Sequence, residues 1–297
     1  SARQVLKQRG IQLETELEAG LEFLMGRVAD NTTEKSRQHY EQSLALWQQI
    51  GDLEKQGHLS FYLGAWWLNY GIRQRVKYQQ GCLQAKEYFS RSINAFKAAK
   101  RLDLVANFIN FLADVLHRLG DWKALENLIS KQPKFNALWL HQHYPNLFRT
   151  ARCYGFLAEI ELAKCQPNNV IFCWQNSARL QRAKRFAKKA LDLLEEAENT
   201  VNISTVDQQS LLAWERSFHQ AWYLFSLGKS QLLLGQVKDS ILTLEAAKAM
   251  TKPYYDPELY IGILSQLRQS YFQQQDYLVA FVIKQEQRSI EGQYGFR

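Results

Sequence analysis

Five residues of the kinds that bind metals or act as nucleophiles fall in the middle of the chain: His141, His143, Cys153, Cys165 and Cys173. Zinc ligands usually lie about two to four residues apart on a turn, and only the two histidines have that spacing. A cysteine nucleophile needs a histidine base beside it in the fold, which a sequence cannot show. The spacing therefore favours buried, structural thiols over a metal site. We expect the chain to need no metal or other cofactor.

The other signatures of catalysis are absent from the sequence. It contains no serine-hydrolase G-x-S-x-G, zinc-protease H-E-x-x-H, Walker phosphate loop or dinucleotide fingerprint. Carboxylates occur as a pair, Glu195 and Glu196, and singly at Glu258, on the ends or exposed faces of expected helices. A carboxylate in a first turn, such as Glu258, stabilises its helix through the dipole. The sequence thus predicts a protein that is not an enzyme.

Six basic residues cluster within one expected helix: Arg179, Arg182, Lys184, Arg185, Lys188 and Lys189. Arg182, Arg185 and Lys189 share one face of that helix, whereas the alanines of the same stretch share another. The simpler interpretation is the solvated outer face of a helix. The alternative is a patch that binds nucleic-acid phosphates or an acidic partner, joined by the basic stretch at 73–77. This patch would consist of Arg179, Arg182, Arg185 and Lys189.

The composition predicts a protein made of helices. Its 297 residues include only 5 prolines and 15 glycines, and residues that lose little freedom in a helix are abundant. The nearest approach to a β-strand pattern, residues 199–206, is better explained as a loop. The net charge of +8 is spread along the chain, which suits a mildly basic protein as well as a nucleic-acid binder.

Several features bear on where the protein works. No apolar run reaches the ~18 residues of a membrane span, and no charged-then-apolar leader opens the chain. The four cysteines form no C-x-x-C pair. We therefore expect a cytoplasmic protein with reduced thiols and no membrane partner. The chain starts at Ser1 without methionine and stops at Arg297 in what reads as continuing sequence, so we expect a module of a longer protein.

The spacing of apolar residues, interrupted by turn residues, divides the chain into helices. We expect these at about 4–28, 34–50, 53–70, a stretch that ends near 101, 103–119, 122–131, 146–165, 173–198, 208–234, 236–250, 257–274 and 276–291. The range 133–145 is the least regular. We predict N-terminal helical repeats in 1–132, an irregular connection at 133–145 and C-terminal helical repeats in 146–297, together forming one continuous array.

The stretch from Ser217 to Arg288 repeats itself. In its first half, an apolar helix and a turn are followed by a second helix with small residues at fixed offsets: Leu224, Leu227, Gly228 and Gly235, then Ser240, Leu244 and Ala247. The same order recurs in Leu264, Leu267, Tyr271, the turn at 275–277 and Ala280. The pattern of the second helix also occurs at Ser36-Tyr40-Ser43 and Ala85-Phe89-Ser92. One such unit cannot bury its own apolar face, so stacked neighbours are predicted.

These residues resemble the tetratricopeptide repeat. Ile109-Leu112-Ala113-Leu116 followed by Gly120-Asp121-Trp122 is similar to the first helix and turn of the same unit. The period departs from the family: 40 residues separate Ser240 from Ala280, and 49 separate Ser36 from Ala85, against about 34 in the family. The resemblance implies an all-α, right-handed solenoid of helical hairpins, with about 11–13 helices and long, degenerate repeats.

A stacked array of hairpins has an extended concave face, lined chiefly by the first helix of each unit. Placing the repeat on this sequence puts five polar residues of otherwise apolar helices there: Asn110, Asp114, Lys229, Gln269 and Gln273. Such residues can hydrogen-bond an incoming peptide or a neighbouring helix. Simple exposure to solvent explains each of them equally well.

The last residues, Gln285-Glu286-Gln287-Arg288-Ser289-Ile290-Glu291 and then Gln293-Tyr294-Gly295-Phe296-Arg297, resemble a junction in large cyanobacterial signalling proteins. In those proteins helical repeats lead into a STAND-class P-loop NTPase, often followed by a WD-repeat propeller. No phosphate-binding glycine loop occurs in this chain, so any NTPase activity would lie outside it. The resemblance implies a non-enzymatic sensor or scaffold that binds a peptide, a protein or a following NTPase domain.

Two alternatives to that function stay open. One is a helical-repeat protein that binds nucleic acid through the basic helix at 179–189. The other is a ligand pocket between the two halves of the chain, near 133–145.

Overall fold

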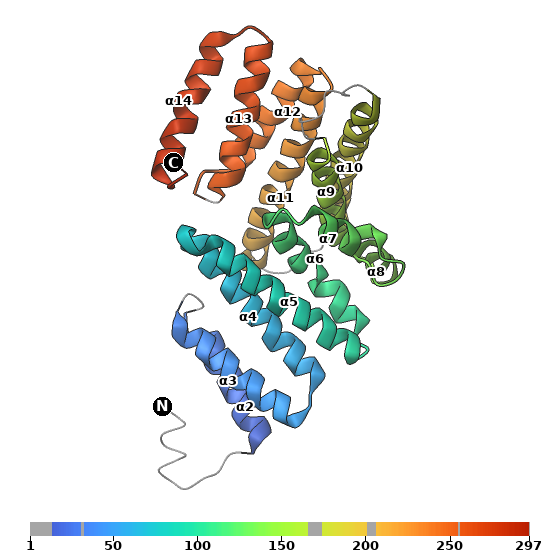
Figure 1. Ribbon diagram of the computed structural model, residues 1–297, viewed down its shortest axis with the longest axis vertical. Coiled ribbons are helices and arrows are strands. Elements are labelled where there is room, and N and C mark those ends of the chain that lie inside the picture. Colours follow the sequence, from blue (N-terminus) through green and yellow to red (C-terminus); the bar gives the residue numbers. More distant parts are fainter. Residues whose placement is uncertain (1–13, 31–32, 166–173, 201–205, 255, 297) are drawn as a thin grey trace. The chain divides into compact units, whose positions relative to one another are not determined.

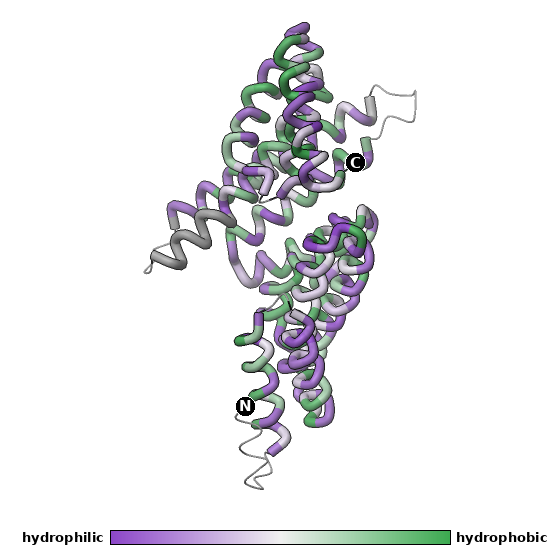
Figure 2. Tube along the Cα trace, turned by 90° about the vertical axis from the view of Figure 1, so that its left-hand side faces the viewer, coloured by the Kyte–Doolittle hydropathy of each residue, from purple (hydrophilic) through white to green (hydrophobic). Residues whose placement is uncertain are grey.

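The computed structural model describes residues 14–30, 33–165, 174–200, 206–254 and 256–296. Every regular element in those ranges is a helix and none is a strand, so the all-α prediction is confirmed for the described part of the chain. Hydrophobic and hydrophilic residues alternate around the helices (Figure 2), as expected of helices that bury one face. Within the same ranges, no helix combines the length and the apolar character needed to cross a membrane.

The chain divides into two compact units, one that ends at Asp121 and one that begins at Trp122. Within each unit, consecutive helices pack against one another and are joined mostly by short turns (Figure 1). The range 133–145, predicted to be an irregular connection, contains a short helix, α8 (Ala137–His143), of the second unit. The division of the repeats at this range stays a prediction.

The first unit contains α2 (Thr15–Val28), α3 (Glu34–Ile50), α4 (Leu53–Arg73), the 3-10 turn η1 (Arg75–Lys77), α5 (Tyr78–Ala98) and α6 (Leu102–Arg118). Thr33 begins α3, because its hydroxyl accepts the Ser36 N–H, and Gly51 ends that helix with a φ of 84°. Asp52 caps α4 by accepting the Lys55 N–H at 2.9 Å. The expected helix at 4–28 lies partly outside the described residues, and its described part is α2.

The second unit contains α7 (Trp122–Glu126), the π-turn η2 (Asn127–Lys131), α8, α9 (Leu147–Ala163), α10 (Trp174–Thr200), α11 (Val206–Leu233), α12 (Val237–Met250), α13 (Pro257–Gln273) and α14 (Tyr277–Gln293). Pro257 occupies the first turn of α13, where a missing N–H costs nothing. Asp256 caps that helix by accepting the Leu259 N–H, and Asp276 caps α14 through the Val279 N–H.

One contact recurs in three helix pairs, α2–α3, α4–α5 and α11–α12. In each, a glycine of the first helix faces a large side chain of the second: Gly26 faces Tyr40, Gly64 faces Phe89, and Gly228 faces Leu244. A Cβ atom on any of these glycines would lie 2.6–2.7 Å from the facing side chain, which is closer than van der Waals contact. The glycines therefore allow the paired helices to approach closely.

Small residues flank each of these large side chains and are buried with them. All are at most 1% exposed: Ser36 and Ser43 beside Tyr40, Ala85 and Ser92 beside Phe89, and Ser240 and Ala247 beside Leu244. The Ser36 hydroxyl donates to the Gly26 carbonyl at 3.0 Å, and the Ser240 hydroxyl donates to the Gly228 carbonyl at 2.8 Å. The small-large-small pattern of the sequence thus lies at the interface within a helix pair.

Candidate functional site

An open groove runs along the surface between α13 and α14. It encloses about 410 Å³ and is lined by Arg268, Gln269, Phe272, Tyr277, Ala280, Phe281 and Lys284. Its aromatic side chains are largely exposed, Phe272 at 62% and Tyr277 and Phe281 at 57% each. The rings of Phe272 and Tyr277 meet edge to face, with centroids 5.2 Å apart. The groove is therefore an apolar surface that the described part of the chain leaves open. We call it the α13–α14 groove.

The turn between the two helices sets the geometry of this groove. Gln275 adopts a left-handed conformation with a φ of 66°. The Asp276 N–H donates to the Tyr271 carbonyl at 3.0 Å, so the chain reverses direction within a few residues. This reversal brings Phe272, near the end of α13, against Tyr277, at the start of α14.

Helix α14 carries more apolar surface than its neighbours bury. Ala280 and Ile283 lie on the buried side of the helix and are 5% exposed each. Leu278 and Val282 lie on another side and are 75% and 58% exposed. With Phe281 they extend the apolar surface beyond the groove. Single exposed apolar residues are ordinary, but a contiguous group of this kind marks an interaction surface.

Two cations and no carboxylate line the groove. Neither Arg268 nor Lys284 forms an ion pair within the described residues. Glu286, two residues after Lys284 on α14, is engaged elsewhere: it accepts bonds from the Lys248 ammonium and the Tyr260 hydroxyl, both at 2.7 Å. Burial and the bond to Glu286 raise the pKa of Tyr260, so this phenol stays protonated and keeps donating. The groove is therefore both apolar and positively charged.

The two glutamines predicted to bind a partner lie on α13. Gln269 lines the groove, and Gln273, one turn further along the helix, is exposed beside it. Their side-chain amides can donate and accept hydrogen bonds at the edge of the apolar surface. The structure thus places these two residues together at one surface; whether they bind a partner stays a prediction.

The other three residues of that predicted set have different surroundings. Lys229 is half-buried on α11, with its ammonium 5.9 Å from the centre of the Phe225 ring. Asp114 pairs with Arg118 one turn along α6, at 3.0 Å. Asn110 is only 1% exposed, so its side chain lies in the core of the first unit. Its prediction as a partner-binding residue is corrected, because a buried amide cannot reach an external peptide.

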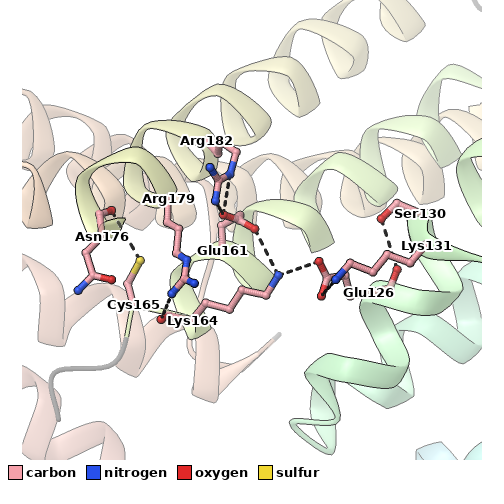
Figure 3. Close-up of polar contacts among 9 residues, drawn as sticks. All are labelled: Glu126, Ser130, Lys131, Glu161, Lys164, Cys165, Asn176, Arg179 and Arg182. Atoms are coloured by element: carbon pink, nitrogen blue, oxygen red, sulfur yellow. Dashed lines mark hydrogen bonds and ion pairs between the residues drawn. The ribbon is translucent and has the colours of Figure 1, made fainter. Parts of the chain in front are cut away.

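The predicted basic patch on α10 is partly neutralised by its own protein. The Arg182 guanidinium pairs with Glu161 of α9 at 2.7 Å, and Arg179 donates to the Lys164 carbonyl at 3.1 Å (Figure 3). Arg185 and Lys189 are exposed. The simpler interpretation predicts that all four residues lie on a solvated face. The structure places only two of them, Arg185 and Lys189, on such a face.

Glu161 belongs to a chain of ion pairs that joins four elements of the second unit, α7, η2, α9 and α10. Lys164 lies 3.4 Å from Glu161 and 2.7 Å from Glu126, and Lys131 lies 3.1 Å from the other oxygen of Glu126 (Figure 3). Burial raises the pKa of Glu126, but the hydrogen bonds from Lys164 and Lys131 outweigh burial and lower it overall. These contacts connect α7 and η2 to α9 and α10 and have a structural role.

His141, the histidine considered as a metal ligand, is 4% exposed, and neither of its ring nitrogens has a hydrogen-bond partner among the described residues. Burial, reinforced by the positive charges of Arg149 and Arg152, lowers its pKa to about 4. The ring is therefore neutral near pH 7. His143 instead stacks on Trp139, with ring centroids 3.9 Å apart, so the two histidines do not act as a pair.

The cysteines of the same set do not assemble into a site either. Cys153 and Cys165 are buried free thiols, and Cys173 lies outside the described residues. Among the residues whose placement is described, no three histidine, cysteine or acidic side chains gather in a way that could hold a metal ion.

Sequence reasoning missed the aromatic residues of the groove. Tyr277 was noted only as part of a turn, and Phe272 and Phe281 were not singled out. A signal was present, because 277, 278, 281 and 282 form an apolar stripe on α14 separate from the buried stripe that contains Ala280 and Ile283. A single neighbouring helix can bury only one of the two apolar stripes, so the other stripe stays exposed.

No protein-family model matches the chain. The chain is similar to an uncharacterised WD repeat-containing protein of Synechocystis sp., with 25% identity over 303 aligned positions. The alignment covers 95% of this chain and 16% of that relative, so the chain spans about a sixth of the length of the curated protein it matches. The match is thus to part of a much longer repeat-containing protein of Synechocystis.

Proposed function

We propose that this chain is a tetratricopeptide-like solenoid of helical hairpins that binds a protein or peptide through the α13–α14 groove. The glycine contact shared by three helix pairs supports a repeated hairpin as the building unit. The similarity to a repeat-containing protein is in keeping with an interaction role. In this proposal the chain binds and does not catalyse.

The exposure of Phe272, Tyr277 and Phe281 is the observation that carries this proposal. Aromatic side chains are enriched in the energetically important parts of protein interfaces, because they bury a large area with little loss of conformational freedom. Here three of them are more than half exposed along one groove. A partner that inserted apolar side chains into the groove would remove this surface from water.

The binding function can be tested without knowing the partner. A phage-displayed library of random peptides would be panned on the purified chain and on a Phe281→Asp variant. We expect the native chain to enrich peptides that the variant does not retain, because a carboxylate within the groove would lose its hydration when an apolar anchor covered it. Substrate turnover by the purified chain would contradict a purely binding function.

Leu242→Asp provides a matched control for this experiment. Leu242 lies on α12 of the same unit and is 73% exposed, but it does not line the groove. The Leu242→Asp variant should retain the same peptides as the native chain. Peptides that bind the Phe281→Asp variant equally well would contradict the groove as the binding surface.

We further propose that the binding serves as the sensor or scaffold part of a larger cytoplasmic signalling protein. The length of the similar Synechocystis protein supports a multidomain context. An adjacent domain of the same chain, such as a P-loop NTPase, is one partner in this proposal. If such a domain occupies the groove, Phe281→Asp in the full-length parent should expose new sites to limited proteolysis, whereas Leu242→Asp should not.

Nucleic-acid binding through α10 is the second candidate function. The observation in its favour is that Arg185, Lys188 and Lys189 are exposed on one helix. Against it, the two other arginines of the predicted patch make contacts within the protein. The protein-binding function is favoured because Arg179 and Arg182 would have to leave their contacts within the protein to bind phosphates. Binding in the α13–α14 groove does not require any such contact to break.

A further inference from the structure

We propose that the α13–α14 groove binds an acidic peptide segment that carries apolar anchor residues. This inference rests on the proposed function, because it names the chemistry of the partner for the same groove. Its starting point is the combination of aromatic rings and cations along one groove, with Arg268 on α13 and Lys284 on α14.

Three carboxylates, one each from α12, α14 and the turn between α13 and α14, make their contacts with other groups of the protein. Glu286 is held by Lys248 and Tyr260, and Glu245 accepts a hydrogen bond from the Tyr271 hydroxyl at 3.1 Å. Asp276 is used as the cap of α14. Each nearby acid therefore has a partner within the protein, whereas Arg268 and Lys284 form no ion pair within the described residues.

On the α9–α10 surface, by contrast, cations are neutralised by a carboxylate of the protein itself. There, Arg182 and Lys164 each lie within 3.4 Å of the Glu161 carboxylate, which is only 10% exposed. The acid that would play the same part for Arg268 and Lys284 is missing from the groove lining. A bound partner would supply it.

The apolar and charged parts of the groove have different tasks. The three rings provide the area that an apolar anchor can bury, and burial is the main source of affinity. Exposed ion pairs add roughly a few-fold each to affinity, and they exclude partners of the wrong charge. Gln269, on the groove wall, can hydrogen-bond the backbone of such a segment.

A single-stranded nucleic acid also combines negative charge with groups that stack on aromatic rings. The groove favours a peptide. Proteins that bind a nucleic-acid strand normally place several cations along its phosphates, whereas only two cations line this groove. The aliphatic side chains of Leu278 and Val282 beside the rings suit apolar amino acids rather than bases. The test below separates the two.

The experiment pans one random-peptide library on the native chain and on an Arg268→Glu/Lys284→Glu variant. We expect the native chain to enrich peptides with Asp or Glu beside an apolar anchor, and the variant to enrich Lys or Arg beside the same kind of anchor. Synthetic peptides from the native pool, measured by fluorescence anisotropy, should bind the variant at least about tenfold more weakly. Lys238→Glu, an exposed reversal on α12, should change neither result.

The possible failures of the two proposals are distinguishable. One outcome is that the selected peptides depend on Phe281 but contain no excess of Asp or Glu. Another is that the native chain and the charge-reversal variant select peptides of the same charge. Either result would overturn the acidic partner and leave the binding function in place. Failure to recover any peptide whose binding depends on Phe281 would overturn both proposals. Displacement of the selected peptide by a short single-stranded oligonucleotide at physiological salt would overturn the peptide in favour of nucleic acid.

A milder variant covers the case in which charge reversal disturbs folding. Arg268→Gln/Lys284→Gln keeps polar side chains of similar length at both positions and removes only the charges. Its helical circular-dichroism spectrum should match that of the native chain, and its affinity for the acidic peptides should fall by roughly a few-fold, with a weaker dependence on salt. An unchanged affinity in a folded variant would overturn the inference.

Discussion

At the residue level, the helix pairs are held together where a glycine leaves room for a large side chain. Gly64 is an example, because Phe89 fills the space that a β-carbon would need. The Phe89 ring is 2% exposed and also contacts Phe61 and Phe111. It has little freedom to move away, so the contact constrains both helices.

Gly64→Ala should destabilise the first unit by up to about 2 kcal/mol. Overpacking a core typically costs about 1–3 kcal/mol, whereas alanine in place of a helical glycine returns only about 0.8–1 kcal/mol. The free energy of unfolding from urea denaturation, followed by circular dichroism, measures the difference. Gly20→Ala on α2 is the control: its Cβ would meet nothing within 4 Å, so it should stabilise. Equal stabilisation by both variants would contradict the packing argument.

His141 makes the second unit sensitive to acid. Its pKa in the folded protein is about 4, below the ordinary value of 6.5, chiefly through burial and then through Arg149 and Arg152. The unfolded chain therefore takes up a proton at higher pH than the folded chain. The stability of the folded state falls as pH falls from about 6.5 towards about 4.

His141→Leu should reduce this pH dependence. In the native chain, the histidine alone should make unfolding about 2 kcal/mol easier at pH 5 than at pH 7. The leucine variant should lose that share of the difference, and it also removes two buried ring nitrogens that have no hydrogen-bond partner in the part of the chain that the structure describes. Unfolding free energies at the two pH values test this. A leucine variant that keeps the full pH dependence of the native chain would contradict this role for His141.

At the level of elements, most helices could be read from the sequence, whereas the partners of their polar side chains could not. Arg182 was placed on a solvated or phosphate-binding face because only its own helix was visible. Its carboxylate partner, Glu161, lies 21 positions away on α9, and helical spacing carries no information about such pairs. The aromatic groove was missed for a related reason, since periodicity marks a residue as apolar without saying whether another element covers it.

The second candidate function makes an element-level prediction for α10. If this helix binds nucleic acid, affinity for a labelled duplex should fall steeply with salt and be lost in an Arg185→Glu/Lys189→Glu variant. Arg182 is left intact in this variant, because its loss would leave Glu161 with one partner fewer and confuse a folding effect with a binding effect. Lys123→Glu on α7 is an exposed control. Duplex binding that survives the double reversal would reject α10 as the site.

At the level of the whole molecule, two compact units each have their own core. In the first unit, Tyr40, Leu63, Phe89 and Phe96 are at most 2% exposed. The hairpin pattern contains two of these core positions, Tyr40 and Phe89, because small-large-small spacing is a property of a helix pair and is visible locally. Leu63 and Phe96 are not part of that pattern. The division between the units after Asp121 was not visible, since it falls at a short turn between two helices, α6 and α7.

A fragment of residues 1–121 should therefore fold by itself. We expect a helical circular-dichroism spectrum and cooperative thermal unfolding, because this unit buries its large aromatic side chains among its own helices. Gly64→Ala should lower the melting temperature of this fragment as it does in the full chain. A fragment without cooperative unfolding would show that the first unit depends on the second.

The placement of the α13–α14 groove also has a consequence for hydrogen exchange. Helix α14 packs chiefly on α13, and several of its apolar side chains remain in contact with water. A helix held from one side opens more often than one enclosed by neighbours, so the amides of Tyr277–Gln293 should exchange with solvent sooner than those of α9 or α12. A peptide in the groove would cover the open side of α14 and slow that exchange. The exchange rate of the α14 amides would therefore measure whether a partner occupies the α13–α14 groove.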